Sequence, residues 1–283
     1  MERTYRLVVS CPDRTGIVAK VSNFLATYNG WITEASYHAD QQNGWFFMRN
    51  EVKASSIPFS VEDFKTAFQP IANEYSMNWS ISDSDAKKRV VLMVSKESHC
   101  LADLLHRWHS KELNAEIVAV ISNHDDLRRM VEWHDIPYHH VPVDPKNKVP
   151  AFDEVNKLVD SYQTDLVVLA RYMQILPAEL CELYSGRVMN IHHSFLPSFA
   201  GAKPYHQAYD RGVKLIGATC HYVTQDLDEG PIIDQDVIRI SHSDSIEDMV
   251  RLGKDAEKNV LARGLRLHLE DRVIIHENKT VVF

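Results

Sequence analysis

The sequence predicts an α/β protein made of two parts, a small open-faced unit followed by a larger, mostly parallel sheet. Within the first 80 or so residues, strand-like and helix-like segments follow one another in the order β-α-β-β-α-β. From Arg89 onward the pattern changes to repeated β-α alternation, and the charged stretch DSDAKKR lies between the two patterns. We therefore expect one domain at residues 1–83, a linker at 84–89 and a second domain at 90–283.

The first unit begins with the apolar strand YRLVVSC, and Asp13 and Thr15 in the following PDRTG stretch are placed to cap a helix. WITEASYHAD and GWFFMRNEV then predict two strands, joined by a Gln-Asn-Gly hairpin turn. Ser60 and Asp63 predict a capping box for a second helix, and MNWSIS predicts the last strand. This order is that of a ferredoxin-like βαββαβ module.

The second unit begins with RVVLMVS, a near-continuous apolar strand typical of buried parallel sheets. CLADLLHRWHS, DDLRRMVEWH, FDEVNKLVDSY and PAELCELYSG predict helices, the last with Gly186 as a C-cap, and the segments between them predict strands. A long helix begins at a Ser245/Asp248 capping box, and RVIIHENKTVVF predicts a closing strand pair. The alternation predicts an open, Rossmann-like parallel sheet with helices on both faces.

Composition excludes several classes of function. The formal net charge of -8 argues against a nucleic-acid groove, which needs a basic face. No apolar run approaches the roughly 18 residues of a membrane span, and the charged N-terminus is unlike a signal peptide. The four cysteines are scattered without a C-x-x-C pair, so we expect neither disulfides nor a thiolate zinc site. A cytoplasmic location follows as an expectation.

Polar side chains gather at the end of the predicted strand RVMNIHH. Asn190 and His192 are two residues apart, so they point to one face of the strand, at the carboxyl end where open α/β sheets place their sites. An amide and an imidazole together supply two donors for one carbonyl oxygen, which is what oxyanion stabilisation requires. In a downstream acidic loop, Asp226, Asp228 and Glu229 include a possible proton-transfer partner for an attacking water.

Less specific interpretations stay open at this point. An Asn-x-His pair at a strand end is often structural, and acidic loops are often solvated. A zinc site would draw on the histidines at positions 192, 193, 206 and 221, but adjacent histidines on a strand point to opposite faces and no H-E-x-x-H pattern is present. We therefore expect no metal and no cofactor.

The segments NIHHSFLPSFAGAKPYHQAYDRG, IGATCHYV and LDEGPII, taken together in this order, resemble the formyltransferase family of folate enzymes. The resemblance runs from about Arg89 to Phe283. It implies that Asn190, His192 and Asp228 catalyse attack on the formyl carbon of 10-formyltetrahydrofolate. It also implies a folate-binding pocket with one wall in VVLARYMQILP and the other in the acidic loop; its residues would be Met173, Ile175, Leu176, Asp226, Leu227, Gly230 and His193.

Two departures from the family select among its reactions. Family members that transfer the formyl group to glycinamide ribonucleotide carry a glycine-rich phosphate loop after the first strand, whereas this chain has SKESHC there. They also usually have proline after the catalytic histidine, where this chain has His193. His193 and the segment from Lys203 to His206 are candidates for shaping the water side of the pocket; a role in loop packing is the alternative.

VVSCPDRTGIVAKVSNFLATYNGWI resembles an ACT domain, a module that often binds amino acids between copies. ACT and formyltransferase domains in one chain resemble the formyltetrahydrofolate deformylase family, in which water is the formyl acceptor. An effector such as glycine or methionine would bind Asp13, Arg14, Thr15 and Gly16, where a helix start offers N–H groups to a carboxylate. The alternative is that this unit only builds a homo-oligomer, a dimer or tetramer. Transfer to an amine, or a non-catalytic folate- or amino-acid-binding regulator, are the other candidate functions.

Overall fold

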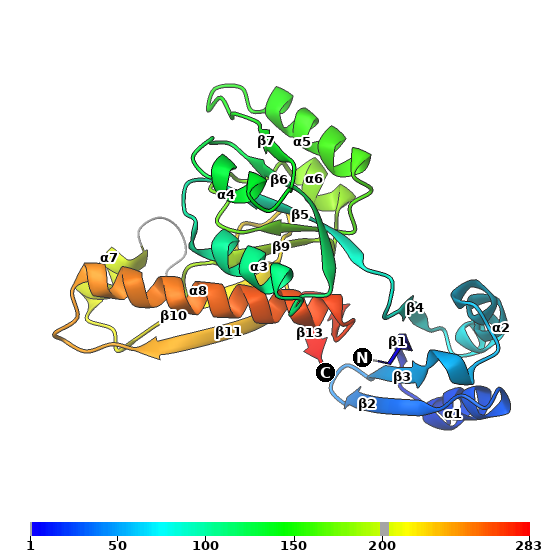
Figure 1. Ribbon diagram of the computed structural model, residues 1–283. Coiled ribbons are helices and arrows are strands. Elements are labelled where there is room, and N and C mark those ends of the chain that lie inside the picture. The colour runs from blue at the N-terminus through cyan, green and yellow to red at the C-terminus, as the bar shows by residue number, and fades with distance from the viewer. Residues whose placement is uncertain (1, 199–203) are drawn as a thin grey trace. The chain divides into compact units, whose positions relative to one another are not determined.

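The computed structural model describes residues 2–198 and 204–283. The chain divides into two compact units, drawn in Figure 1. The first unit consists of the chain up to Lys87 together with Glu270–His276 and Val281–Phe283, and the second consists of Lys88–Leu269 and Glu277–Thr280. The end of the chain therefore contributes to the first unit, whereas the division from sequence assigned residues 90–283 to the second domain.

The first unit has the expected order of elements, β-α-β-β-α-β, with one short 3-10 helix added. Its elements are β1 (Thr4–Pro12), α1 (Ile17–Thr27), β2 (Ile32–Asp40), β3 (Trp45–Lys53), η1 (Ala54–Ser56), α2 (Val61–Glu74) and β4 (Asn78–Asp83). The strands form an antiparallel sheet in the order β2-β3-β1-β4. Buried aromatic rings join the helices, since Phe24 of α1 meets Phe64 and Phe68 of α2 edge to face at 5.3 Å.

The two helix starts of this unit differ. The capping box expected at α2 is present, because Ser60 and Asp63 hydrogen-bond each other's backbone. The expectation that Asp13 and Thr15 cap α1 is wrong. The N-cap is Gly16, at φ 96, and no side chain caps this helix. Glycine tolerates this left-handed conformation without the steric penalty of a Cβ atom, so the turn itself begins the helix.

The second unit is built on a seven-stranded sheet. Its elements are β5 (Lys88–Val94), α3 (His99–His109), β6 (Ala115–Ser122), α4 (Arg128–Glu132), β7 (Tyr138–His140), α5 (Val149–Ser161), β8 (Leu166–Leu169), α6 (Ala178–Leu183), β9 (Val188–His192), α7 (Pro204–Arg211), β10 (Leu215–Tyr222), β11 (Ile232–Arg239) and α8 (Ile246–Leu269). The strand order is β11-β10-β9-β8-β5-β6-β7. Strands β5 to β9 are parallel, and β10 and β11 are antiparallel, so the expected mostly parallel sheet is confirmed.

Helices cover both faces of this sheet, as the alternation predicted. On one face α5 packs through Phe152, Val155 and Val159 against inward-pointing residues of β5, β6 and β8. On the other face α3 lies beside the long α8, which also contacts β9, β10 and β11 (Figure 1). The helix expected from DDLRRMVEWH is shorter than predicted. Only α4 is helical, and turns flank it on both sides.

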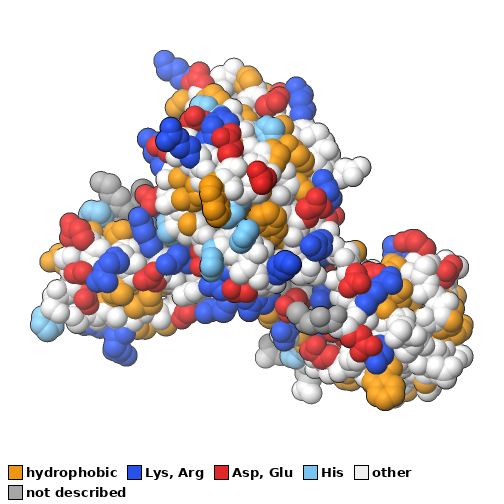
Figure 2. Space-filling view, in the orientation of Figure 1, with side chains coloured by type: hydrophobic (Ala, Val, Ile, Leu, Met, Phe, Trp, Pro, Cys, Tyr) orange, Lys and Arg blue, Asp and Glu red, His pale blue; other side chains and the backbone are white. Residues whose placement is uncertain are grey.

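The C-terminal elements follow the prediction. The Ser245/Asp248 capping box at the start of α8 is present, with Asp248 N donating to Ser245 Oγ at 3.1 Å and Ser245 N to the Asp248 carboxylate at 3.1 Å. Strands β12 (Val273–His276) and β13 (Lys279–Val282) form the expected pair. No helix in residues 2–198 and 204–283 is long and apolar enough to span a membrane. On the visible face, acidic and basic side chains are interspersed (Figure 2).

Candidate active site

Asn190 and His192 lie on β9, between the parallel β8 and the antiparallel β10. The register places Asn190 opposite His221 and His192 opposite Thr219. Asn190 Nδ2 is 3.1 Å from His221 Nε2, and His221 Nδ1 is 2.9 Å from the Tyr222 carbonyl oxygen. His221 therefore donates through Nδ1 and accepts the Asn190 amide at Nε2, which fixes the rotation of that amide.

His192 and Asp228 form the central pair of the site. His192 Nδ1 lies 3.2 Å from Asp228 Oδ1, and both side chains are largely buried. Across the described residues, the opposite nitrogen of the ring, Nε2, is buried and has no hydrogen-bond partner. The structure thus brings together the three residues expected from sequence and leaves one ring nitrogen available for a bound molecule.

The loop that carries Asp228 is held against β10 by a close backbone contact. Asp228 itself has φ 59, a left-handed conformation that aspartate tolerates better than most residues. At Gly230 an added Cβ atom would lie 1.9 Å from the Tyr222 carbonyl oxygen, so only glycine fits there. Gly230 therefore sets the position of Asp228 and does not line the pocket.

The charge states of the site follow from burial and from the neighbouring histidines. Burial acts to raise the pKa of Asp228, but the hydrogen bond from His192 and the charges of His192, His221 and His193 outweigh it and lower the pKa. Burial lowers the pKa of His221, which keeps its ring neutral, as its two hydrogen bonds require. Asp228 is therefore an ionised carboxylate beside His192.

A cavity of about 390 Å³ surrounds these residues. Asn190, His192, His221 and Asp228 line it, together with six of the seven residues expected to bind the folate: Met173, Ile175, Leu176, Asp226, Leu227 and His193. Met173, Ile175 and Leu227 are 56%, 59% and 57% exposed. Exposed apolar side chains gathered around a pocket are typical of a binding site for a partly apolar small molecule.

The apolar wall of the cavity is hydrogen-bonded to the end of β5, the first strand of the second unit along the chain. Ser95, at the end of β5, accepts the Met173 backbone N–H at 2.9 Å and donates to Asn123 Oδ1 at 2.6 Å. Tyr172, in the same wall, has a buried hydroxyl, and burial raises its pKa to about 12. Ser95 was missed from sequence, and His221 was considered only as a zinc ligand, because their roles here depend on which strands are neighbours.

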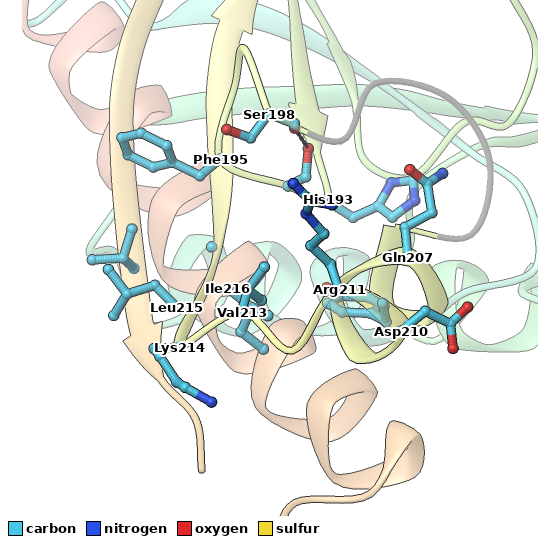
Figure 3. A pocket seen from close by; sticks show the side chains of 15 residues that line it. His193, Phe195, Ser198, Gln207, Asp210, Arg211, Val213, Lys214, Leu215 and Ile216 are labelled. Atoms are coloured by element: carbon cyan, nitrogen blue, oxygen red, sulfur yellow. Dashed lines mark hydrogen bonds between the residues drawn. The ribbon is translucent and has the colours of Figure 1, made fainter. Parts of the chain in front are cut away.

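The segment after β9 is hydrogen-bonded to β10 and borders a second cavity. Thr219 Oγ1 donates to the Ser194 carbonyl at 2.9 Å and accepts the Leu196 N–H at 3.0 Å. The second cavity, about 1060 Å³, has apolar side chains of Phe195 and Leu215 on one side and Gln207 and Arg211 on the other (Figure 3). His193 lines both cavities. Lys203 lies outside the described residues.

The candidate effector residues belong to the first unit. Asp13, Arg14, Thr15 and Gly16 are all exposed, at the start of α1. The Arg14 guanidinium lies over the Tyr75 ring, 3.8 Å from its centroid, and also donates to the Glu74 carbonyl oxygen. Arg14 is therefore held against α2 and its C-cap residue.

The histidines considered for zinc do not form a metal site in the described part of the chain. Within residues 2–198 and 204–283, the one group with suitable spacing is His99, Cys100 and Glu257. Burial and the Glu257 charge raise the pKa of the Cys100 thiol well above its usual value, which disfavours the thiolate that a metal needs. Arg171 lies 3.4 Å from Glu257, and its positive charge also disfavours a cation.

Residues 88–265 match the family model described as formyl transferase. Formyltetrahydrofolate deformylase of Bacillus subtilis is 47% identical over 279 residues, covering 98% of this chain and 93% of that protein.

Two solved structures show how far the likeness extends. The crystal structure of a formyltetrahydrofolate deformylase from Pseudomonas syringae pv. tomato has a TM-score of 0.99 and 71% identity, covering 100% of this chain and 95% of that one. A phosphoribosylglycinamide formyltransferase from Coxiella burnetii has a TM-score of 0.65 and 30% identity, covering 70% of this chain and 94% of that one. With both units matched by the first structure, the chain belongs to the formyltetrahydrofolate deformylase family.

Proposed function

We propose that this protein hydrolyses 10-formyltetrahydrofolate to formate and tetrahydrofolate. The observation that carries this proposal is the arrangement of His192, with Asp228 on one ring nitrogen and the cavity side chains around the other. Membership in the deformylase family supports the same reaction.

The folate binds in the 390 Å³ cavity. Met173, Ile175 and Leu176 contact one face of the pterin, and Asp226 and Leu227 of the acidic loop contact the other. The exposed apolar side chains of Met173, Ile175 and Leu227 support this assignment, because a bound ring system would cover them.

Two donors stabilise the formyl oxygen as negative charge develops on it. The Asn190 amide has two N–H groups, of which one is directed to His221, so the second is available for the oxygen. His192 supplies the other donor from Nε2 when its ring carries both protons and Nδ1 donates to Asp228. Preorganised donors of this kind act mainly on the transition state.

Asp228 orients His192 and receives or relays the proton of the attacking water. The water oxygen forms a bond to the formyl carbon, the bond from that carbon to N10 breaks, and N10 takes up a proton. We propose no metal ion or cofactor for this reaction.

Formate release distinguishes this reaction from its alternatives. Purified protein is incubated with 10-formyltetrahydrofolate in the absence of any amine, and formate and tetrahydrofolate are measured. Equal release of both products is expected. Consumption only after an amine such as glycinamide ribonucleotide is added would indicate a transferase, and binding without turnover would indicate a regulator. The glycine-free loop before α3 favours water, because it lacks the phosphate cradle of the glycinamide ribonucleotide transferases.

For the first unit we propose an ACT-type regulatory and oligomerisation domain at residues 1–83. Its βαββαβ order and exposed turn from Asp13 to Gly16 support this assignment. The uncapped start of α1 offers N–H groups to the carboxylate of an amino acid. Isothermal titration with glycine and with methionine tests the effector, and no heat with either contradicts it. Light scattering tests whether the protein is a dimer or a tetramer.

Free, buried cysteines fit the expected cytoplasmic location.

A further inference from the structure

A carboxylate outside the proposed catalytic residues, Glu257 of α8, is 1% exposed. Its Oε2 atom lies 2.7 Å from His99 Nε2 and 3.4 Å from Arg171 Nε, and its Oε1 atom accepts the Tyr205 hydroxyl at 2.9 Å. A buried carboxylate is costly unless donors and positive charge surround it, so these contacts fix the four side chains relative to one another. We name His99, Arg171, Tyr205 and Glu257 the Glu257 cluster.

The cluster joins four separate parts of the second unit. His99 begins α3, Arg171 follows β8 in a left-handed conformation at φ 67, and Tyr205 lies in α7. Tyr205 packs against α8 at Gly253, where an added Cβ atom would lie 2.0 Å from the tyrosine hydroxyl oxygen. The glycine one turn before Glu257 thus makes room for the tyrosine that binds it.

The cluster forms the wall behind His193. Arg171 lines the cavity of about 390 Å³ that holds the proposed catalytic residues. Tyr205 lines the cavity of about 1060 Å³ in Figure 3, and His193 lines both. The His193 ring centroid is 5.2 Å from that of His192 and 6.1 Å from that of Tyr205. His193 and this wall therefore lie at the border between the two cavities.

Burial and the neighbouring charges determine the state of His193. Burial, followed by the charges of Arg171 and His192, lowers its pKa to about 4 although Glu257 and Asp228 oppose this change. A neutral imidazole has one donor and one acceptor, which suits it to orient a water molecule. Burial acts to raise the pKa of Glu257, but His99, Arg171 and Tyr205 outweigh it and lower the pKa, so the carboxylate is ionised.

Building on the proposed hydrolysis, we propose that the Glu257 cluster is a positioning and specificity element. It fixes Arg171 and His193 on the side of the 390 Å³ cavity from which the formyl acceptor approaches. Water can then reach the formyl carbon, whereas larger amines cannot. The members of the cluster act through His193 and through the shape of the wall. A purely structural role would stabilise the fold without affecting the choice between nucleophiles.

A competing nucleophile separates these two roles. Water gives formate and tetrahydrofolate, whereas hydroxylamine, attacking the same carbon through nitrogen, gives formohydroxamate and tetrahydrofolate. The wild type, Glu257→Gln and Tyr205→Phe are compared at one fixed hydroxylamine concentration, with the enzyme-free rate subtracted. Glu247→Gln is the matched control, because Glu247 is an exposed residue of the same helix. Both products, kcat, KM and Tm are measured.

For Glu257→Gln we expect kcat to fall at least about tenfold with little change in KM, because small misplacements near reacting atoms are costly. The ratio of formohydroxamate to formate should rise in both cluster variants and stay constant in Glu247→Gln. An unchanged kcat and product ratio in the folded variants, whether or not Tm falls, would overturn the proposal. If Glu257→Gln does not fold, Tyr205→Phe decides. Absence of formate from the wild type would instead refute the proposed hydrolysis.

Discussion

Asp228 Oδ1 lies 3.2 Å from Nδ1 of His192, and the other nitrogen of the same ring is buried without a partner among the described residues. The carboxylate therefore fixes which edge of the imidazole faces the cavity. Because Gly230 and β10 hold the Asp228 loop in place, the orientation of His192 depends on backbone contacts outside β9.

Asp228→Asn should lower kcat for formate release by at least about a hundredfold, since proton transfer by a positioned side chain contributes roughly that much. The amide keeps the size of the carboxylate but does not accept a proton at neutral pH. KM should change little, because the apolar wall is intact. The exposed Asp255→Asn on α8 serves as the control. Near wild-type kcat in Asp228→Asn would contradict the proposed role.

Asn190→Ala should lower kcat by about a hundred- to a thousandfold, the usual effect of removing one oxyanion donor. His221→Ala should lower kcat by a smaller factor, because it removes the side chain that orients the Asn190 amide. In the double variant the two effects should not add, since His221 acts through Asn190. Steady-state kinetics of the four proteins measure this; full additivity would show that the two residues act independently.

Gly230→Ala should abolish most activity and lower stability, because its Cβ atom would meet the Tyr222 carbonyl oxygen at 1.9 Å and displace the Asp228 loop. The matched control is Gly44→Ala, which introduces strain at φ 66 but meets no atom within 4 Å. Formate release and thermal unfolding are measured for both. Equal losses of activity in the two variants would argue against a specific role for the contact at Gly230.

Stability should decrease as pH falls from about 6.5 to about 4, the usual and folded-state pKa values of His193. In this range the unfolded chain binds a proton at His193 that the folded chain does not bind. The free energy of unfolding then falls by up to about 1.4 kcal/mol per pH unit for this one proton. The lowered pKa of His221 acts in the same direction.

Urea unfolding at several pH values tests this dependence on His193. The variant His193→Gln should show a flatter decrease of unfolding free energy than the wild type, and the exposed control His242→Gln should follow the wild type. The same slope in all three proteins would show that His193 is not responsible.

In the first unit, Arg49→Ala should lower the free energy of unfolding by about 3 kcal/mol, because it removes a large buried side chain and leaves the acceptors around it without their donor. The Arg49 side chain is 1% exposed, contacts Glu51, lies 3.2 Å from Glu34, and donates to the Glu270 carbonyl at 2.9 Å. Lys65→Ala, which removes an exposed pair with Glu62, should cost less than about 1 kcal/mol. Chemical denaturation compares them, and similar losses would be inconsistent with this interpretation.

Local patterns predicted the elements and part of the site, because they act over a few residues. Asn190 and His192 share a face through strand alternation, and the Ser60 and Ser245 capping boxes are readable over four residues. The antiparallel direction of β10 was not predicted, so His221 was not placed opposite Asn190. Glu257 was missed because its partners come from α3, α7 and the segment after β8.

The pairing of Asn190 with His221 ties the chemistry to the register between β9 and β10. A slip of β10 by one residue would turn His221 to the opposite face of the sheet and withdraw the Asp228 loop with it. Insertions and deletions around α7 are therefore tolerated only if they preserve this register. The register of β9 and β10 is therefore as necessary to the site as the identities of Asn190 and His221.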